Sequence, residues 1–373
     1  MKILVISDSF KGSMTSRDIC DIARSVVRDE FSDVDLVTIP VADGGEGTVE
    51  SFVEAIGAEP VTIEVTGPYS DTTVKATYAR AGYTAIIEAA EACGLPLVEE
   101  LGREKDPFKT TTYGVGELVL DALESGCINI LLGLGGTSTN DGGCGLAAAL
   151  DTRFYDKDGE EFVPVGGTLK NIARIDTTYT HAAFHEVSLT AMCDVDNPTV
   201  GAEGAAFVFA PQKGAPADRI FQLDDGLKNL CNVIERDLSV KVADLPGGGA
   251  AGGMGAGCVA FFDGKLVSGI DAVLDAVNFD DLIKDVDLII TGEGHLDSQS
   301  IAGKAISGIA KRADGVPVVA IVGKSDCTYD EIKSLGLRAV YETGDDETPL
   351  EELMARARDD YRRVLIDVIK ANI

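Results

Sequence analysis

Polar side chains follow several short apolar runs of the sequence, and carboxylates dominate among them. In an open parallel sheet the ligand site lies beyond the carboxyl ends of the strands, so a polar residue just after such a run is a candidate for function. Taken alone, one Asp in this position is most simply a helix cap or a turn residue. Repetition over five loops favours a shared site. The candidates are Asp8 and Lys11; Asp43 and Glu46; Thr137, Ser138, Thr139, Asn140 and Asp141; Asp194 and Asn197; and Glu293, Asp297 and Gln299.

A glycine-rich loop, GLGGTSTNDGGCG, occupies residues 133–145 and carries six glycines around a polar run. Exposed backbone N–H groups and hydroxyls near the start of a helix suit a phosphate group. The alternative is a tight turn with a close backbone approach, which explains the glycines but not the polar residues between them. We therefore favour a phosphate-binding loop.

Familiar nucleotide-binding and hydrolase motifs are absent from the sequence. Gly323-Lys324-Ser325 is only half a P-loop, because the glycine required earlier is Val318, and we predict an ordinary loop there. The run 246–253 contains a formal GxGxxG, but no clean strand precedes it. Residues 247–257 are interpreted equally well as a hinge, as a close backbone approach to a ligand, or as packing glycines. With three histidines and no GxSxG elbow, a hydrolytic triad is improbable.

Carboxylates for a cation, a lysine and a glycine-rich anion site together suit phosphoryl transfer. In that chemistry catalysis is mainly positioning and charge neutralisation around magnesium. The residue types alone predict nothing more specific.

The elements that must position these residues alternate between strand and helix. Residues 3–6 form a continuous apolar run, as in a strand covered on both faces, and Thr15 with Asp18 makes a capping box before a helix. A second such unit leads from 35–43 into a helix beginning at Thr48. Further predicted strands lie in 128–132, 188–197, 287–300 and 316–326, with short helical stretches after them and a last helix from about Pro349. This pattern predicts a parallel βα fold.

Residues 61–79 have a different pattern, with apolar and polar residues alternating around a Gly-Pro turn. That pattern predicts an antiparallel hairpin, which a doubly wound parallel sheet does not need. We therefore expect two domains. A doubly wound α/β domain is expected from 1–60 with 285–373, and an inserted mixed α+β domain from 61–284.

Composition excludes several classes of protein. The chain has 373 residues with 62 acidic and 32 basic side chains, a net charge of −30, and no basic run. We therefore expect no nucleic-acid partner and no binding to anionic membranes, since both need clustered cations. The N-terminal apolar run is far too short for a signal peptide or a membrane span, so a cytoplasmic protein is expected. The eight cysteines are scattered singly, without the spacing of a zinc or disulfide framework.

As a set, the motifs resemble the bacterial glycerate kinases, and the resemblance spans nearly the whole chain. Each motif is weak alone, but eight in the same order are highly specific. They are DSFKGS (8–13), DGGEGT (43–48), TTYGVGELVLDAL (111–123), GLGGTSTNDGGCG (133–145), CDVDNP (193–198), GAAFVFAPQKGA (204–215), PGGGAAGGMGAG (246–257) and TGEGHLDSQS with GK (291–304).

The resemblance implies transfer of the γ-phosphoryl group of ATP to D-glycerate, with the 2-hydroxyl favoured over the 3-hydroxyl. It also implies a flavodoxin-like domain formed by both chain ends and an active site in the cleft beside the inserted domain. ATP and Mg²⁺ are the expected cofactors, and a monomer or homodimer is expected. The alternatives are a kinase for another small hydroxy acid and a non-catalytic sensor of a small anionic solute.

Roles within that site are expectations. Lys11 should contact phosphate oxygens or the glycerate carboxylate, and Asp194, with Asp8 as second choice, should orient or deprotonate the attacking hydroxyl. Asp43, Glu293 and Asp297 are the expected magnesium ligands, directly or through water. The remaining residues expected to bind substrate or phosphate are Ser9, Gly135, Gly136, Thr137, Ser138, Thr139, Asn140, Asp141, Asn197, Gln299 and Lys304.

Overall fold

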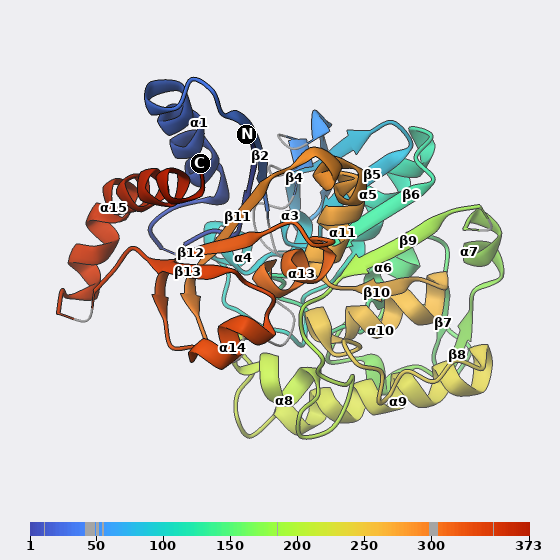
Figure 1. Ribbon diagram of the computed structural model, residues 1–373. Helices are drawn as coiled ribbons and strands as arrows, with labels where there is room; N and C mark the ends of the chain where they lie inside the picture. The colour runs from blue at the N-terminus through green and yellow to red at the C-terminus, as the bar shows by residue number, and fades with distance from the viewer. Residues whose placement is uncertain are drawn as a thin grey trace. The chain divides into compact units, whose positions relative to one another are not determined.

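The structure, a computed structural model, describes residues 1–10, 12–41, 49, 52–53, 56–184, 186–297, 305–345 and 347–373 (Figure 1). The chain forms two compact units. Unit 1 consists of Met1–Asp43, Glu50–Gly57 and Ser268–Ile373, and unit 2 consists of Gly44–Val49 and Ala58–Val267. Both chain ends therefore build one unit, and most of the middle of the chain builds the other.

Unit 1 contains a parallel sheet of five strands in the order β13-β12-β11-β1-β2. Counted along this unit, that order is 2-1-3-4-5, the flavodoxin-like arrangement. The strands are β1 (Lys2–Ser7), β2 (Asp35–Pro40), β11 (Leu288–Leu296), β12 (Val318–Ser325) and β13 (Ala339–Glu342). The apolar run 3–6 is fully buried within β1, which confirms a strand covered on both faces.

Two long helices pack on one face of this sheet. Helix α1 (Ser16–Glu30) begins with the expected capping box of Thr15 and Asp18, and α15 (Leu350–Asn372) begins directly after Pro349, as expected. Ile3 and Val5 of β1 share a buried core with both helices. The side chains of Leu4 and Ile6 point to the other face, because successive strand residues alternate. The other helices of unit 1 are α11 (Gly269–Ala276), α12 (Phe279–Leu282), η3 (Ile283–Asp285), α13 (Ala305–Arg312) and α14 (Tyr329–Ser334).

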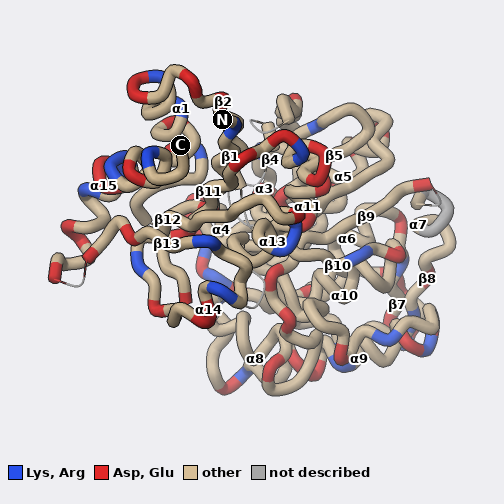
Figure 2. The backbone as a smooth tube through the Cα atoms, in the orientation of Figure 1, with Lys and Arg blue, Asp and Glu red and all other residues tan. Residues whose placement is uncertain are grey.

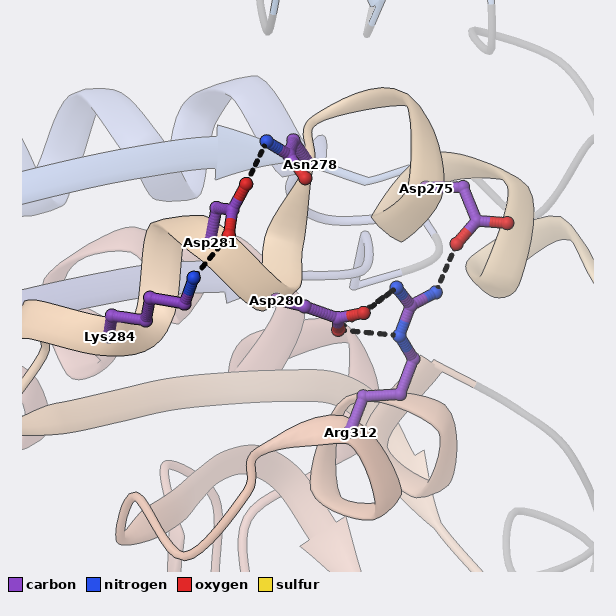
Figure 3. Close-up of polar contacts among 6 residues, drawn as sticks. All are labelled: Asp275, Asn278, Asp280, Asp281, Lys284 and Arg312. Carbon is purple, nitrogen blue, oxygen red and sulfur yellow. Dashed lines mark hydrogen bonds and ion pairs between the residues drawn. The ribbon is translucent and has the colours of Figure 1, made fainter.

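Residues 268–284 belong to unit 1, whereas the sequence placed the return to the first domain near 285. Contacts of α13 with α11 and α12 join these residues to unit 1, and the side chain of Arg312 makes several of them. It binds both carboxylate oxygens of Asp280 at 3.0 Å and lies 2.6 Å from the carboxylate of Asp275 (Figure 3). Gly308 of α13 also allows Ile270 of α11 to approach closely. These contacts join residues more than thirty positions apart along the chain, so no local pattern signals them.

Unit 2 contains a mixed sheet of six strands in the order β10-β9-β6-β5-β4-β3. The strands are β3 (Glu59–Thr66), β4 (Thr73–Ala81), β5 (Thr84–Glu88), β6 (Asn129–Gly133), β9 (Ser188–Met192) and β10 (Lys265–Val267). The expected hairpin is confirmed, since β3 and β4 pair antiparallel from Glu59 with Arg80 to Thr66 with Thr73. Strands β5, β6, β9 and β10 run parallel to one another. A separate ribbon joins β7 (Arg153–Tyr155) to β8 (Arg174–Asp176).

The helices of unit 2 enclose its core around Leu118, Leu132 and Phe261. They are α3 (Ala90–Cys93), α4 (Leu95–Glu100), α5 (Tyr113–Glu124), α6 (Cys144–Ala149), η1 (Leu169–Asn171), α7 (Thr178–Ala183), α8 (Ala205–Phe209), η2 (Pro211–Lys213), α9 (Ile220–Leu238) and α10 (Ala250–Phe262). Figure 2 shows acidic positions spread over both units, with basic positions among them along α9 and α15. Across the described ranges, no helix is long and apolar enough to cross a membrane.

One local prediction is wrong. Gly323-Lys324-Ser325, expected to form a loop, is the last part of strand β12. Strand β11 extends beside it, with His295 opposite Lys324 and Leu296 opposite Ser325. Pairing with β11 therefore extends β12 through Gly323, the residue at which the sequence predicted the end of the strand. Most of the helix expected from Thr48 lies outside the described residues.

Candidate functional site

The loop after β6 is the glycine-rich loop of the sequence, and its polar residues are buried. Thr137, Ser138, Thr139, Asn140 and Asp141 are at most 3% exposed. Ser138 donates from both its backbone N–H and its hydroxyl to the carbonyl oxygen of Cys93, at 2.8 and 2.9 Å. The loop is thus closely packed inside unit 2, and part of its hydrogen-bonding capacity serves the fold.

Asp141 organises the starts of helices α5 and α6. Its carboxylate accepts hydrogen bonds from the N–H and hydroxyl of Thr112 at 2.8 and 2.9 Å, and from the N–H groups of Gly143 and Gly145 at 3.1 and 3.2 Å. Burial raises the pKa of Asp141, and these hydrogen bonds act in the opposite direction. The carboxylate that we expected to bind ligand therefore accepts four hydrogen bonds from three residues of the protein.

Two adjacent residues of the loop have buried side-chain atoms without a hydrogen-bond partner within the part of the chain that the structure describes. They are the hydroxyl of Thr139 and both the amide nitrogen and the amide oxygen of Asn140. Buried polar groups nearly always have a partner, which can be an ordered water or a ligand. Asn140 is therefore the residue of this loop best suited to receive a small polar molecule.

A lysine that the sequence did not single out contacts this loop. Lys213, in η2, is 3% exposed, and its ammonium group donates to the carbonyl of Thr139 at 2.7 Å and to the hydroxyl of Thr137 at 3.2 Å. Burial lowers the pKa of Lys213 to about 8. The motif GAAFVFAPQKGA marks the position, but only the fold shows that the side chain points inward.

The glycine run at the start of α10 packs against the same loop. Gly252 has φ +68°, and a Cβ atom there would lie 2.1 Å from the carbonyl oxygen of Thr139. The N–H of Gly142 donates to the carbonyl of Gly252 at 3.0 Å. Of the interpretations considered for 247–257, packing against another part of the protein therefore describes this glycine, since its neighbours are backbone atoms of Thr139 and Asn140.

Asp194 and Asn197 follow β9, the strand next to β6 in the sheet. Asp194 is exposed, and the side-chain amide of Asn197 donates to the carbonyl of Glu203 at 2.8 Å. The carbonyl of Asn197 accepts from the N–H of Gly249 at 3.0 Å. The glycine run thus contacts both strand-end loops of unit 2, and the structure brings Asn197 and the loop after β6 to the same glycine-rich segment.

The remaining described candidates lie in unit 1. Asp8 and Ser9 follow β1, and the N–H of Asp8 donates to the carbonyl of Gly292 in β11 at 3.0 Å. Glu293, expected in a loop after its strand, lies inside β11 opposite Val322 and is 6% exposed. Asp297 follows that strand and is half-buried. Asp8 is therefore next to Gly292 and Glu293 of the neighbouring strand, whereas Asp297 lies four residues further along, just after β11.

Five candidate residues of the sequence analysis lie outside the described residues. They are Lys11, Asp43, Glu46, Gln299 and Lys304. Among the residues that are described, no three His, Cys, Asp or Glu side chains form a group that could hold a metal ion. A complete set of metal ligands is therefore not visible in the described part of unit 1.

A comparison with protein families decides the relationship that the motifs suggested. The model of the glycerate kinase family matches residues 3–372. The chain belongs to the glycerate kinase family. Its membership shows that it is an enzyme of the kinase type, which excludes the alternative of a non-catalytic sensor.

Relatives from several bacteria support this assignment over nearly the full length of the chain. A glycerate kinase of Halalkalibacterium halodurans is 45% identical over 91% of this chain and 90% of its own. A glycerate 2-kinase of Escherichia coli is 41% identical over 97% of this chain and 96% of its own. A solved structure described as glycerate kinase 2 from Salmonella typhimurium LT2 is 40% identical, with a TM-score of 0.86 over 100% of this chain and 98% of its own.

Proposed function

We propose that this enzyme transfers the γ-phosphoryl group of ATP to the 2-hydroxyl of D-glycerate and releases 2-phosphoglycerate and ADP. The observation that carries the proposal is the 41% identity, over 97% of the chain, to the glycerate 2-kinase of Escherichia coli. Because ATP is the proposed donor, the proposed place of action is the cytoplasm. A monomer or a homodimer remains the proposed form.

Asp194 is the proposed group that orients the attacking hydroxyl and receives its proton. The hydroxyl oxygen forms a bond to the γ-phosphorus, the bond from that phosphorus to the bridging oxygen of ADP breaks, and the proton passes to the carboxylate. An ordinary aspartate is a weak base at neutral pH, so its position must contribute more than its pKa. The exposure of Asp194 at the end of β9 suits this role, because a substrate can reach it. Asp8 is the second candidate.

The loop after β6 is the proposed anion-binding element, with Gly135, Gly136 and Asn140 as its ligand-facing part. Gly135 is partly exposed and Gly136 is exposed, whereas Ser138 and Asp141 are already hydrogen-bonded within the fold. Lys11, Ser9, Asn197, Gln299 and Lys304 are the other proposed contacts to substrate or phosphate. A lysine opposite developing negative charge stabilises the transition state, and its loss costs several kcal/mol.

Asp43, Glu293 and Asp297 are the proposed residues for Mg²⁺. Carboxylate oxygens are the donors that this cation prefers, and the positions of Glu293 within β11 and Asp297 just after it fit that chemistry. When bound, Mg²⁺ neutralises charge on the phosphate oxygens. The part of these side chains would be to hold the ion or its bound waters in place.

The experiment that tests the proposal is phosphorus NMR of the products formed from ATP, Mg²⁺ and D-glycerate. A 2-phosphoglycerate signal supports it, and a 3-phosphoglycerate signal changes only the hydroxyl that is used. If glycerate stays unphosphorylated while another small hydroxy acid is turned over, the substrate proposal is wrong.

A pair of variants in one loop tests the role of Asp194. Asp194→Asn should lower kcat by about 100-fold or more, the usual range for loss of a general base. Asp196→Asn, at an exposed neighbouring position of the same loop, is the matched control and should keep near wild-type turnover. Equal rates for both variants would remove Asp194 from the role.

A further inference from the structure

Lys213 joins two segments of unit 2 that are far apart in the sequence. It ends η2, which follows α8, and α8 follows the loop that carries Asp194 and Asn197. Its ammonium group bonds to Thr137 and Thr139 in the loop after β6. The buried side chain of Lys213 thus connects the proposed anion-binding loop after β6 to the segment that follows Asp194, the proposed base.

The backbone around Lys213 is held tightly in place. Gly214 has φ +94°, and a Cβ atom there would lie 2.2 Å from the carbonyl oxygen of Lys105. The chain therefore turns sharply against a second segment directly after Lys213. Since η2 is anchored in this way, the hydrogen bonds of Lys213 hold the loop relative to a fixed support.

A charged amine is an expensive choice for an interior position. Burying an ammonium group costs free energy that an apolar side chain of similar length does not require. Within unit 2 the carboxylate of Asp141 already has four hydrogen-bond donors of its own. The two hydrogen bonds from Lys213 to the loop offset part of this cost, and they fix the position of the loop.

We propose that Lys213 is a positioning residue for the phosphoryl transfer: its ammonium group fixes the loop 137–141 relative to the segment that carries Asp194 and Asn197. The proposal rests on the function proposed above. A displacement of about 1 Å in a loop that positions reacting groups can lower a rate by about 100-fold. The ammonium group therefore acts through the loop, without touching the substrate.

The charge of Lys213 gives this role a pH signature. Burial lowers its pKa to about 8, so the amine loses its charge and one donor in the mildly alkaline range. The other titratable groups that act on it are Cys93 in α3 and Asp141 ahead of α6. Burial raises the pKa of Cys93 to about 12, well above this range. The neutral amine keeps two N–H donors, but hydrogen bonds from a charged donor are about twice as strong as those from a neutral one. The contact of Lys213 with the loop therefore weakens, and turnover should fall as pH rises through about 8 in the wild-type enzyme.

Kinetics of Lys213→Met and Lys213→Arg over pH 6.5 to 9.5 test the proposal, with Lys241→Met at an exposed position as the control. Per folded protein at pH 7, the Met variant should lose at least about tenfold in kcat with KM for D-glycerate changed far less. The Arg variant stays charged, so it should recover much of kcat and lose the alkaline fall. An alkaline fall that persists in Lys213→Arg would assign the fall to another group and overturn the proposal, as would unchanged kcat in Lys213→Met.

Hydrogen exchange of the wild-type protein and the two variants separates this inference from the proposed function. Protection of the amides in 137–143 should fall in Lys213→Met, and in the wild type between pH 7 and pH 9, but not in Lys241→Met. If glycerate is never phosphorylated while this protection changes as expected, the proposed reaction fails and the positioning contact stands. Unchanged protection in the wild type between the two pH values overturns the positioning contact, even where neither variant folds.

Discussion

Replacing Gly252 by Ala tests whether the close approach between α10 and the loop after β6 is required. The added Cβ would lie 2.1 Å from the carbonyl oxygen of Thr139 and 2.5 Å from the Cα atom of Asn140. These are backbone atoms, so relief requires the loop itself to move by about 1 Å. Gly252→Ala should therefore reduce both stability and turnover.

The expected loss has two parts. A left-handed backbone conformation costs about 1–2 kcal/mol for a residue with a Cβ atom. Overpacking against backbone adds about 1–3 kcal/mol. Gly102→Ala supplies the matched control, since Gly102 has φ +64° but no atom within 4 Å of the added Cβ. Gly102→Ala should show only the cost of the left-handed backbone conformation.

Thermal denaturation followed by far-UV circular dichroism measures the difference, because the chain has no tryptophan for fluorescence. About 2 kcal/mol between the two variants corresponds to roughly 4–8 °C for a unit of this size. In the proposed reaction, kcat of folded Gly252→Ala should also fall by about tenfold or more, because the loop that positions substrate is displaced. Equal melting temperatures for Gly252→Ala and Gly102→Ala would refute the packing argument.

Three further perturbations follow from the same contacts. Asp141→Asn should lower the free energy of unfolding by about 2–3 kcal/mol, because the new amide nitrogen would face at least one buried N–H group. Urea denaturation measures this loss. Arg312→Ala should cost about 1 kcal/mol and increase proteolysis near α11 and α12, since its ion pairs are partly exposed. Between pH 8 and 10.5, the free energy of unfolding of the wild type should rise by up to about 3 kcal/mol relative to Lys213→Met. The reason is that the Lys213 amine keeps its proton in the unfolded state over this range but releases it in the folded state.

Two of these comparisons have a control of the same residue type. Asp225→Asn, at an exposed site in α9, should leave stability nearly unchanged beside Asp141→Asn. Arg28→Ala removes a more exposed pair at the end of α1 and should have the smaller effect beside Arg312→Ala. For Lys213, the expectation is contradicted if the free energy of unfolding of the wild type falls relative to that of Lys213→Met as pH rises from 8 to 10.5.

Several features of the fold could be predicted from the sequence because they depend on neighbouring residues. The apolar run 3–6 predicted a strand buried on both faces, Thr15 with Asp18 predicted the start of α1, and the alternation in 61–79 predicted the hairpin. The ordered motifs predicted the family. In each case the signal and the structure lie within one short segment, or in the order of such segments.

Other features were decided only by tertiary structure. The extension of β12 through Gly323 depends on the length of β11, and the return of 268–284 to unit 1 depends on the contacts of α13 with α11 and α12. The burial of Lys213 and the two hydrogen bonds from Thr112 to Asp141 are likewise absent from any local pattern. Each depends on contacts between residues that are distant along the chain, and a hydrogen bond or a steric limit acts through space without regard to sequence separation.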